Sequence, residues 1–370
     1  MKLPTAIMLA LLSAVLFGLS TPAAKLLVGL IDPWLLAGLL YLGAGLGLGL
    51  LTILRRFLGQ RRDGDSASEA PLRRSDLPWL AAVILCGGVA GPLLLMLGLA
   101  QVPASTASLL LNLEGVFSLG IAWIIFRENV DLRIFIGATA ILCGAGLLSW
   151  PVTAESGGGA ALSGIGLIAA ACLCWAIDNN LTRKLSAADP LQITLAKGLV
   201  AGSVNLALAL IHGAALPGPG TLLATGLVGL LGYGVSLICF VLALRHLGTA
   251  RTGAYFSLAP FVGAAAAFLL LGEPLTPLFA GAALLMAIGL YLHLAERHQH
   301  EHRHDALFHD HRHVHDAHHD HQHDNHAHDN HAHDDHDGVT PTEPHSHPHW
   351  HRPLIHSHRH FPDLHHRHRH

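Results

Sequence analysis

The sequence has few charged residues, few aromatic residues and few cysteines. Charged residues make up 13% of its 370 residues, aromatic residues make up 6%, and there are five cysteines. It has no Gly-rich phosphate loop, no helical HExxH motif and no plausible Ser/His/Asp nucleophile arrangement, so neither an enzyme nor ATP-driven transport is indicated. All five cysteines fall inside apolar segments, where we expect them to pack as small apolar residues rather than form disulfides or CxxC metal sites.

The sequence is rich in long apolar segments. Hydrophobic residues reach 51% and the mean hydropathy is +0.45. A helix that spans a membrane needs about 20 mostly apolar residues. We therefore predict an all-α integral membrane protein with ten transmembrane helices, at Thr5–Ala24, Pro33–Leu54, Leu77–Leu97, Ala107–Phe126, Phe135–Trp150, Ser163–Leu181, Leu191–Ile211, Leu222–Leu242, Gly253–Leu271 and Leu278–Leu294.

Lysine and arginine test this layout independently, because short cytoplasmic loops collect them. With the N-terminus inside, the inner segments hold 13 basic residues and the outer loops hold Lys25 alone. We expect a multi-pass protein of the cytoplasmic (inner) membrane with both termini cytoplasmic. Lys25 and the other cations at helix ends are expected to reach lipid headgroups and fix this topology. Glu128 and Glu273 end equivalent spans and are expected to make local polar contacts.

The second five segments repeat the first five. Leu113–Phe117 matches Leu258–Val262 at an offset of 145, and Phe17–Lys25 matches Trp175–Arg183 at an offset of 158. An odd number of spans in each copy forces the second copy into the membrane upside down. Many secondary transporters use such inverted repeats to build one site that faces each side in turn. The predicted domains are a first five-helix repeat (1–150), a second five-helix repeat (151–296) and a His-rich cytoplasmic tail (297–370).

These features resemble a known family. The duplicated ten-segment plan, the Leu-Glu-Gly-Val-Phe stretch (113–117) and the Leu-Gly-Glu-Pro-Leu-Thr stretch (271–276) are similar to EamA-type members of the drug/metabolite transporter superfamily. The likeness covers about residues 5–295 and leaves out the tail. It implies a ten-helix fold with a central cavity between the halves, and carriage of small solutes, often by export. One departure is that Gly115 follows Glu114, where the family commonly has Glu-Pro.

Ionisable groups inside spans are costly to bury and mark substrate or proton pathways. Glu114 lies near the middle of the fourth span, where burial favours its neutral form. It is expected either to exchange a proton or hold a cation, or to bond to a neighbouring helix as a neutral acid. Asp178 and Lys197 stand equally far from the centre of the loop between the sixth and seventh spans. Antiparallel helices would bring them to one depth as an ion pair, either structural or lining a substrate cavity.

The amides of Asn179 and Asn180 are suited to a polar solute or to hydrogen bonds between helices. Together with the three ionisable residues they complete the predicted substrate-binding set, which is Glu114, Asp178, Asn179, Asn180 and Lys197.

The tail from residue 297 to 370 holds 28 of the 31 histidines. It has almost nothing to bury, so we predict that it is disordered. Neutral imidazole binds Zn, Ni, Co and Cu ions, and His-x-His spacing lets several rings meet one ion. Metal on the tail would serve a metal-carrying membrane domain, respond to metal or pH, or have no purpose. The predicted metal ligands are His323, His326, His328, His331, His333 and His336; no cofactor is required.

The sequence thus predicts a secondary transporter of small solutes, of the drug/metabolite type and working by alternating access, for which export is one direction. Two alternatives stay open: a divalent metal-ion carrier loaded by the tail, and a non-transporting membrane-anchored metal store or sensor. The expected partners are the lipid bilayer and a small-molecule or ion substrate. No nucleic-acid partner is expected, and a homodimer is left open.

Overall fold

The structure is a computed structural model, and it describes residues 3–57, 77–126, 132–154, 159–182, 190–247, 249–294, 298–304, 307–313, 345–351 and 354–360. The chain forms two compact units, Met1–Glu296 and Arg297–His370, which are described separately.

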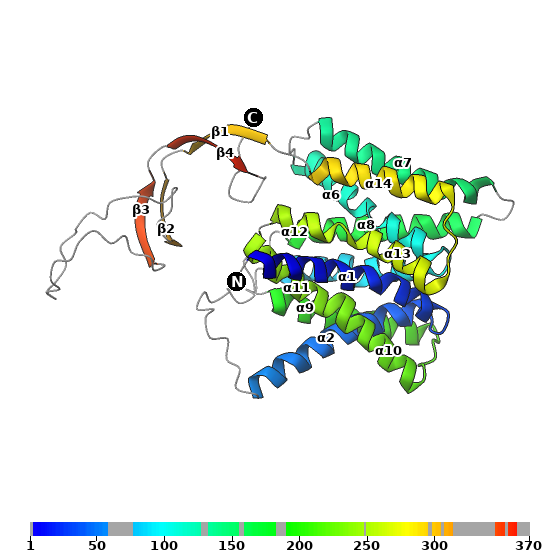
Figure 1. Ribbon diagram of the computed structural model, residues 1–370. Helices are drawn as coiled ribbons and strands as arrows, with labels where there is room; N and C mark the ends of the chain where they lie inside the picture. The colour runs from blue at the N-terminus through cyan, green and yellow to red at the C-terminus, as the bar shows by residue number, and fades with distance from the viewer. Residues whose placement is uncertain are drawn as a thin grey trace. The chain divides into compact units, whose positions relative to one another are not determined.

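In the first unit, every secondary-structure element among the described residues is a helix (Figure 1). Its first half holds α1 (Leu3–Val28), α2 (Pro33–Phe57), α3 (Leu77–Val83), η2 (Ile84–Ala90), α4 (Gly91–Leu99), α5 (Ala104–Leu110), α6 (Leu113–Phe126) and α7 (Leu132–Ala154). Its second half holds α8 (Gly159–Thr182), α9 (Pro190–Ile211), α10 (Pro219–Gly229), η4 (Leu230–Val235), α11 (Ser236–Leu247), α12 (Thr249–Phe256), α13 (Ala259–Leu271) and α14 (Pro277–Leu294).

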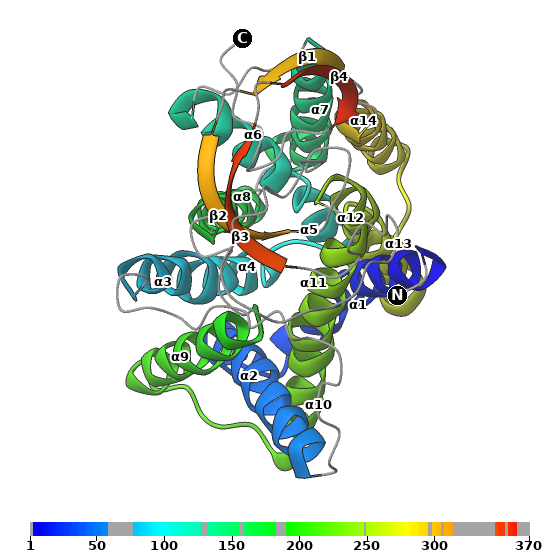
Figure 2. The ribbon, with the colours of Figure 1, turned by 90° about the vertical axis from the view of Figure 1, so that its left-hand side faces the viewer.

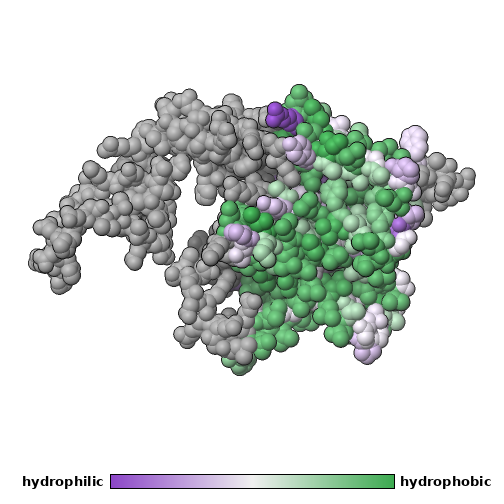
Figure 3. All heavy atoms as spheres, in the orientation of Figure 1, coloured by the Kyte–Doolittle hydropathy of each residue, from purple (hydrophilic) through white to green (hydrophobic). Residues whose placement is uncertain are grey.

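Apolar side chains cover most of the face of the helical unit that Figure 3 shows. Among the described residues, Leu50, Ile124 and Leu269, for example, expose 65%, 71% and 85% of their surface. A broad apolar face of this kind is stable against lipid and unstable against water. Within the described residues, nine helical segments are long and apolar enough to cross a membrane, which supports a multi-pass membrane protein. The tenth predicted span corresponds to α14, whose apolar stretch Pro277–Leu292 is shorter than the others.

The two halves pack on each other reciprocally. Helix α1 of the first half contacts α11 and α13, while α8 of the second half contacts α4 and α6. Helix α2 lies beside α9, and α7 beside α14 (Figures 1 and 2). In the repeat, α8 corresponds to α1, α11 to α4, and α13 to α6. The contacts of α1 with the second half are therefore the same as those of α8 with the first half. The centre of the unit is therefore built by helices from both halves.

Both halves are interrupted at matching places. The third predicted span of each half is an α-helix with π-helical turns in its middle, η2 and η4. The fourth is broken by a turn, at Leu111–Asn112 in one half and at Ser257–Leu258 in the other. The sequence predicted one span in each of these four places and gave no position for the interruptions. The first break forms even though Gly115 stands where the second half has Pro260, so proline is not needed for it.

Helices α2 and α9 approach closely because glycines face each other. A Cβ added to Gly38 would lie 2.6 Å from the backbone nitrogen of Leu206, and one added to Gly202 would lie 2.6 Å from that of Leu42. Small residues permit this approach, which gains dispersion contacts where lipid provides no hydrophobic drive to associate. This contact fixes α9 against the first half.

The second unit contains four strands among its described residues, β1 (His298–His304), β2 (Leu307–His313), β3 (His345–His351) and β4 (Leu354–His360). β1 pairs antiparallel with β4, and β2 with β3. The sequence predicted a disordered tail, and the structure differs over these four segments. Alternation of His with other residues has the period of two of a strand, and ladder hydrogen bonds need no apolar side chains.

Candidate functional site

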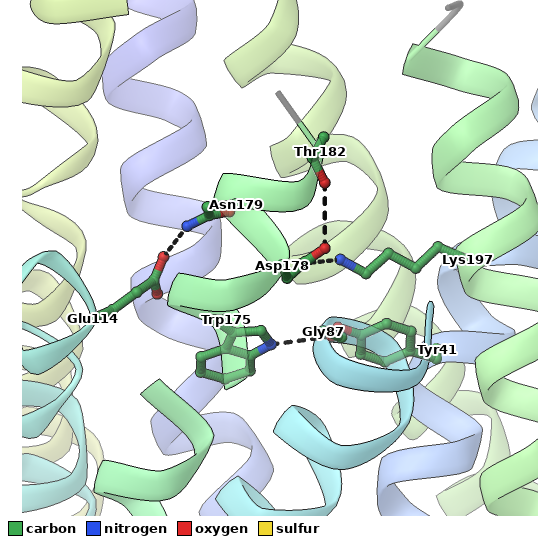
Figure 4. Close-up of polar contacts among 8 residues, drawn as sticks. All are labelled: Tyr41, Gly87, Glu114, Trp175, Asp178, Asn179, Thr182 and Lys197. Atoms are coloured by element: carbon green, nitrogen blue, oxygen red, sulfur yellow. Dashed lines mark hydrogen bonds and ion pairs between the residues drawn. The ribbon is translucent and has the colours of Figure 1, made fainter. Parts of the chain in front are cut away.

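Helix α8 lies at the centre of the candidate site: its Asp178 points toward Lys197, and its Asn179 points toward Glu114 (Figure 4). Asp178 is 4% exposed and forms an ion pair with the Nζ atom of Lys197 on α9. Thr182, one turn further along α8, donates from Oγ1 to Asp178 Oδ1 at 3.3 Å. The ion pair that the symmetric spacing predicted is confirmed. Each charge removes most of the cost of burying the other, because an isolated charge inside the bundle would lose its hydration without a partner.

The π-helical segment η2 lies directly against this pair. Its Gly87 carbonyl oxygen accepts two hydrogen bonds, from Tyr41 Oη at 2.8 Å and from Trp175 Nε1 at 3.1 Å. A π-helix bonds residue i to i+5 and so disturbs the regular α-helical pairing of its carbonyls. The side chains of Tyr41 and Trp175 satisfy the carbonyl that faces the site. Helices α2, η2 and α8 are thereby joined at one atom.

Gly87 also makes room for Asp178. A Cβ at position 87 would lie 2.7 Å from the Cβ of Asp178, and real Cβ atoms essentially never approach that closely. Gly87→Ala is therefore expected to push Asp178 away from Lys197 and to destabilise the protein by about 1–3 kcal/mol, as overpacking does. The measurements are the thermal unfolding temperature of the protein in detergent and its transport rate.

Gly120→Ala is the matched control for this prediction. Nothing lies within 4 Å of a Cβ at Gly120, which is also a helical position. The control is expected to unfold at the wild-type temperature or slightly above it, since Ala is the better helix former. Equal behaviour of the two variants would contradict the packing argument.

Glu114 lies in the first turn of α6, just after the break in the fourth span. Its Oε1 atom accepts a hydrogen bond from Asn179 Nδ2 at 2.6 Å. A carboxylate is favoured at a helix N-terminus, because the unpaired N–H groups there carry partial positive charge. Asn179 is uncharged, so this bond leaves Glu114 without the neutralisation that Asp178 receives from Lys197.

The structure therefore joins four of the five predicted site residues in two pairs. Asp178 and Asn179 are neighbours on α8, one bonded to α9 and the other to α6. Asn180 is buried, and its Nδ2 atom bonds to the carbonyl of Ala176 in its own helix at 2.8 Å. The role of these residues in binding a solute stays a prediction.

The six predicted metal ligands, from His323 to His336, lie outside the described residues. In the part of the chain that the structure does describe, no three His, Cys, Asp or Glu residues come together as a metal site.

The sequence did not point to Trp175, Thr182, Tyr41 or Gly87. The spacing of Trp175, Asp178 and Thr182 places all three on one face of a helix. Once Asp178 is a candidate, this spacing points to Trp175 and Thr182. Nothing in the sequence could have found Tyr41 and Gly87, which reach the site only because three helices converge.

The acidic residues of the candidate site, Asp178 and Glu114, have no acidic counterparts at the equivalent positions of the other half. At the offset of 158, Asp178 corresponds to Ser20, and at 145 Glu114 corresponds to Ala259. The packing is nevertheless shared: a Cβ at Gly232 in η4 would lie 2.5 Å from the Cβ of Ser20, as a Cβ at Gly87 would meet Asp178. The backbone framework is thus common to both halves, while the charges belong to one.

The nine membrane-length apolar segments of the described residues, which enclose a buried ion pair, are those of a multi-pass membrane protein. Its sequence matches the EamA-like transporter family over residues 4–150 and again over residues 162–295. The chain belongs to the EamA-like transporter family.

Curated relatives are named as transporters. An "uncharacterized transporter" of Methanothermobacter thermautotrophicus is 31% identical over 76% of this chain and 83% of its own. A "probable terminal-alkyne amino-acid exporter" of Streptantibioticus cattleyicolor is 30% identical over 78% of this chain and 93% of its own. A "probable amino-acid metabolite efflux pump" of Salmonella typhimurium is 30% identical over 52% of this chain and 68% of its own.

A solved crystal structure has a similar fold. It superposes with a TM-score of 0.55 at 18% identity and covers 78% of this chain and 95% of that one. At this identity the likeness concerns the fold alone.

Proposed function

We propose that the chain is a secondary transporter that exports small zwitterionic solutes of the amino-acid type by alternating access. The observation that carries this proposal is the pairing of Asp178 with Lys197, next to the carboxyl group of Glu114, which is bonded to the uncharged amide of Asn179. A zwitterion presents an ammonium group and a carboxylate, which match the carboxylates of Glu114 and Asp178 and the ammonium group of Lys197. The names of two relatives support an amino-acid-like solute and the outward direction.

An aromatic row next to the ion pair suits the apolar part of such a solute. The ring of Tyr41 lies 5.6 Å from that of Tyr233, which lies 5.9 Å from Phe17; Phe17 in turn lies 5.3 Å from Phe256. The row passes between the two halves, and it begins at the tyrosine that bonds to Gly87. A site that has the ion pair at one end and this aromatic row beside it favours an amino acid with an apolar side chain over glycine.

Alternating access follows from the same arrangement. We propose ten spans in two inverted repeats with both termini in the cytoplasm, as the distribution of Lys and Arg favours. The reciprocal packing of α1 and α8 is what two such repeats produce. Glu114 is the proposed coupling group, which exchanges a proton as the site changes sides.

The direct test is efflux from proteoliposomes that contain the purified full chain. Vesicles loaded with radiolabelled L-leucine, L-phenylalanine or glycine are followed with and without a pH gradient. We expect faster efflux of the first two than from protein-free vesicles, a smaller effect on glycine, and a dependence on the pH gradient. Equal rates with and without protein for all three solutes would overturn the amino-acid proposal.

The His-rich tail supports a second candidate, a carrier or store of divalent metal. We expect that removing residues 297–370 abolishes Zn²⁺ and Ni²⁺ binding by the purified protein and leaves L-leucine efflux within about two-fold of the full chain, since the tail forms a unit of its own. Efflux and metal binding are measured on the same preparations. Loss of metal tolerance in cells, with no efflux from either form, would favour the metal store instead.

A further inference from the structure

The turn that joins α4 to α5 is partly buried, although it lies between two predicted spans. Val102 within the turn is 3% exposed, and the flanking Leu99, Ala104 and Ser105 are 0%, 0% and 4% exposed, whereas Ala100 and Pro103 are exposed. Connecting turns normally lie at a surface, because their backbone N–H and C=O groups lack partners within a helix and need water or side chains. The backbone groups of the buried positions, Leu99, Val102, Ala104 and Ser105, therefore need side chains in place of water.

Two charged side chains from distant parts of the chain supply those partners. Lys25 Nζ donates to the carbonyl oxygens of Leu99 at 2.6 Å and Val102 at 2.7 Å. The Glu273 carboxylate accepts from the backbone N–H of Ala104 at 2.7 Å and of Ser105 at 2.9 Å. The cation thus lies at the C-terminal end of α4 and the anion at the N-terminal end of α5, which is the favourable orientation for both helix dipoles. We call Lys25 and Glu273 the turn clamp.

The local backbone positions both members of the clamp. Lys25 lies in the last turn of α1. Gly272 ends α13 in the left-handed conformation, with φ of 65°, and this bend directs the next residue, Glu273, back toward α5. The sequence predicted that Lys25 would reach lipid headgroups and that Glu273 would make local contacts. The structure corrects the first, because Lys25 binds backbone carbonyls of the α4–α5 turn, and it shows that the polar contacts of Glu273 are made with a segment distant in the sequence.

The clamp is connected to the candidate site through α5. This helix of seven residues runs from the clamped turn to Leu110, and Glu114 follows after the break at Leu111–Asn112. At the far end of α5, the Sγ atom of Cys172 on α8 bonds to the carbonyl oxygen of Leu110 at 3.6 Å. Any shift of α5 therefore disturbs both Glu114 and the surroundings of Cys172.

We propose that Lys25 and Glu273 are positioning residues for transport, which hold the α4–α5 turn so that this end of the bundle stays closed, and which release it when the bundle opens there. The proposal rests on the transport function put forward above. It differs from a purely stabilising role because it requires the turn and α5 to move while the rest of the unit stays folded.

The thiol of Cys172 can report this motion, because it is fully buried. In a full-length form that keeps only Cys172, labelling by N-ethylmaleimide in native membranes is compared for Lys25→Met, Glu273→Gln and Lys25→Arg. We expect labelling about ten-fold faster in the first two, since each loses charge-assisted hydrogen bonds to the turn, and near the starting rate in the third, which keeps the cation.

A second form that keeps only Cys239 separates release of the turn from general loosening. Cys239 is also buried and lies on α11 in the other half. Its labelling is expected to stay constant in all three variants. Unchanged labelling of Cys172, or equal acceleration at Cys239, would overturn the proposal. Glu273→Gln keeps one hydrogen-bond acceptor, so it provides a folded variant should Lys25→Met not accumulate.

Efflux of L-leucine supplies the functional readout. The two clamp variants are expected to change the maximal rate about five-fold or more with little change in the half-saturating concentration, because the clamp does not touch the solute. An altered half-saturating concentration at an unchanged maximal rate would count against the proposal. Because thiol labelling needs no solute, failure of L-leucine efflux in the wild type would refute the proposed function and leave the result on the clamp intact.

Discussion

Lys197→Met is expected to remove most of the protein from the membrane fraction and to abolish transport by the part that remains. Among the described residues, the substitution leaves the carboxylate of Asp178 inside the bundle with the hydroxyl of Thr182 as its side-chain partner. The side chains of Asp178 and Lys197 are 6% and 18% exposed, so water compensates little of the loss. Breaking a buried pair by removing one partner costs about 3–5 kcal/mol, a large fraction of the stability of most proteins.

Abundance in isolated membranes, the unfolding temperature in detergent and L-leucine efflux together measure this effect. The double variant Asp178→Asn with Lys197→Met is expected to recover abundance, because no charge is left without a partner, but not efflux. Lys184→Met removes the same side chain from a predicted loop and should behave as wild type. Normal abundance and efflux in the single Lys197→Met variant would refute the ion pair as described.

Glu114→Gln is expected to leave the protein folded and to lower efflux by at least about ten-fold, because the group that exchanges a proton is gone. Glutamine has nearly the same size as glutamate, and its amide oxygen can accept the bond that Asn179 Nδ2 donates. The structural contact thus survives while the ionisable group is lost. This separates a coupling role for Glu114 from a neutral hydrogen bond between α6 and α8.

The measurement is L-leucine efflux with and without an imposed pH gradient. In Glu114→Gln, the rate of L-leucine efflux is expected to be the same with and without the pH gradient. In Glu114→Asp, the gradient is expected to retain part of its effect on that rate. Glu301→Gln removes an equal charge outside the helical unit and serves as the control. A Gln variant that keeps both the rate and the response to the gradient would show that Glu114 is structural.

The sequence predicts the helices and one ion pair well, for physical reasons. Membrane helices are set by apolar length, which is a local property, so nine predicted spans correspond to membrane-length segments in the described chain. Asp178 and Lys197 were predictable because a single loop joins α8 to α9, and symmetry about that loop fixes their depth.

Other features depend on contacts between distant segments, which one sequence does not contain. Lys25 meets a turn more than 70 residues away, and Glu273 meets the start of α5 across about 170 residues. Similarly, Tyr41 on α2 donates to the carbonyl oxygen of Gly87 in η2, which is 46 residues further along the chain. The breaks in the fourth spans, at Leu111–Asn112 and Ser257–Leu258, lie inside stretches whose apolar length predicts one span each, and apolar length does not locate them.

The matching π-helical segments indicate which features of the two halves are older and which are more recent. A wider helical turn at the same place in both halves is most simply a property of the single half from which both descend, copied when the gene doubled. The acids at positions 178 and 114 have no acidic counterparts at positions 20 and 259, so they differ between the copies. An ancestor with two identical halves would have had such an acid in both halves or in neither. The difference in acidic residues between the halves therefore arose later than the π-helical segments that both halves share.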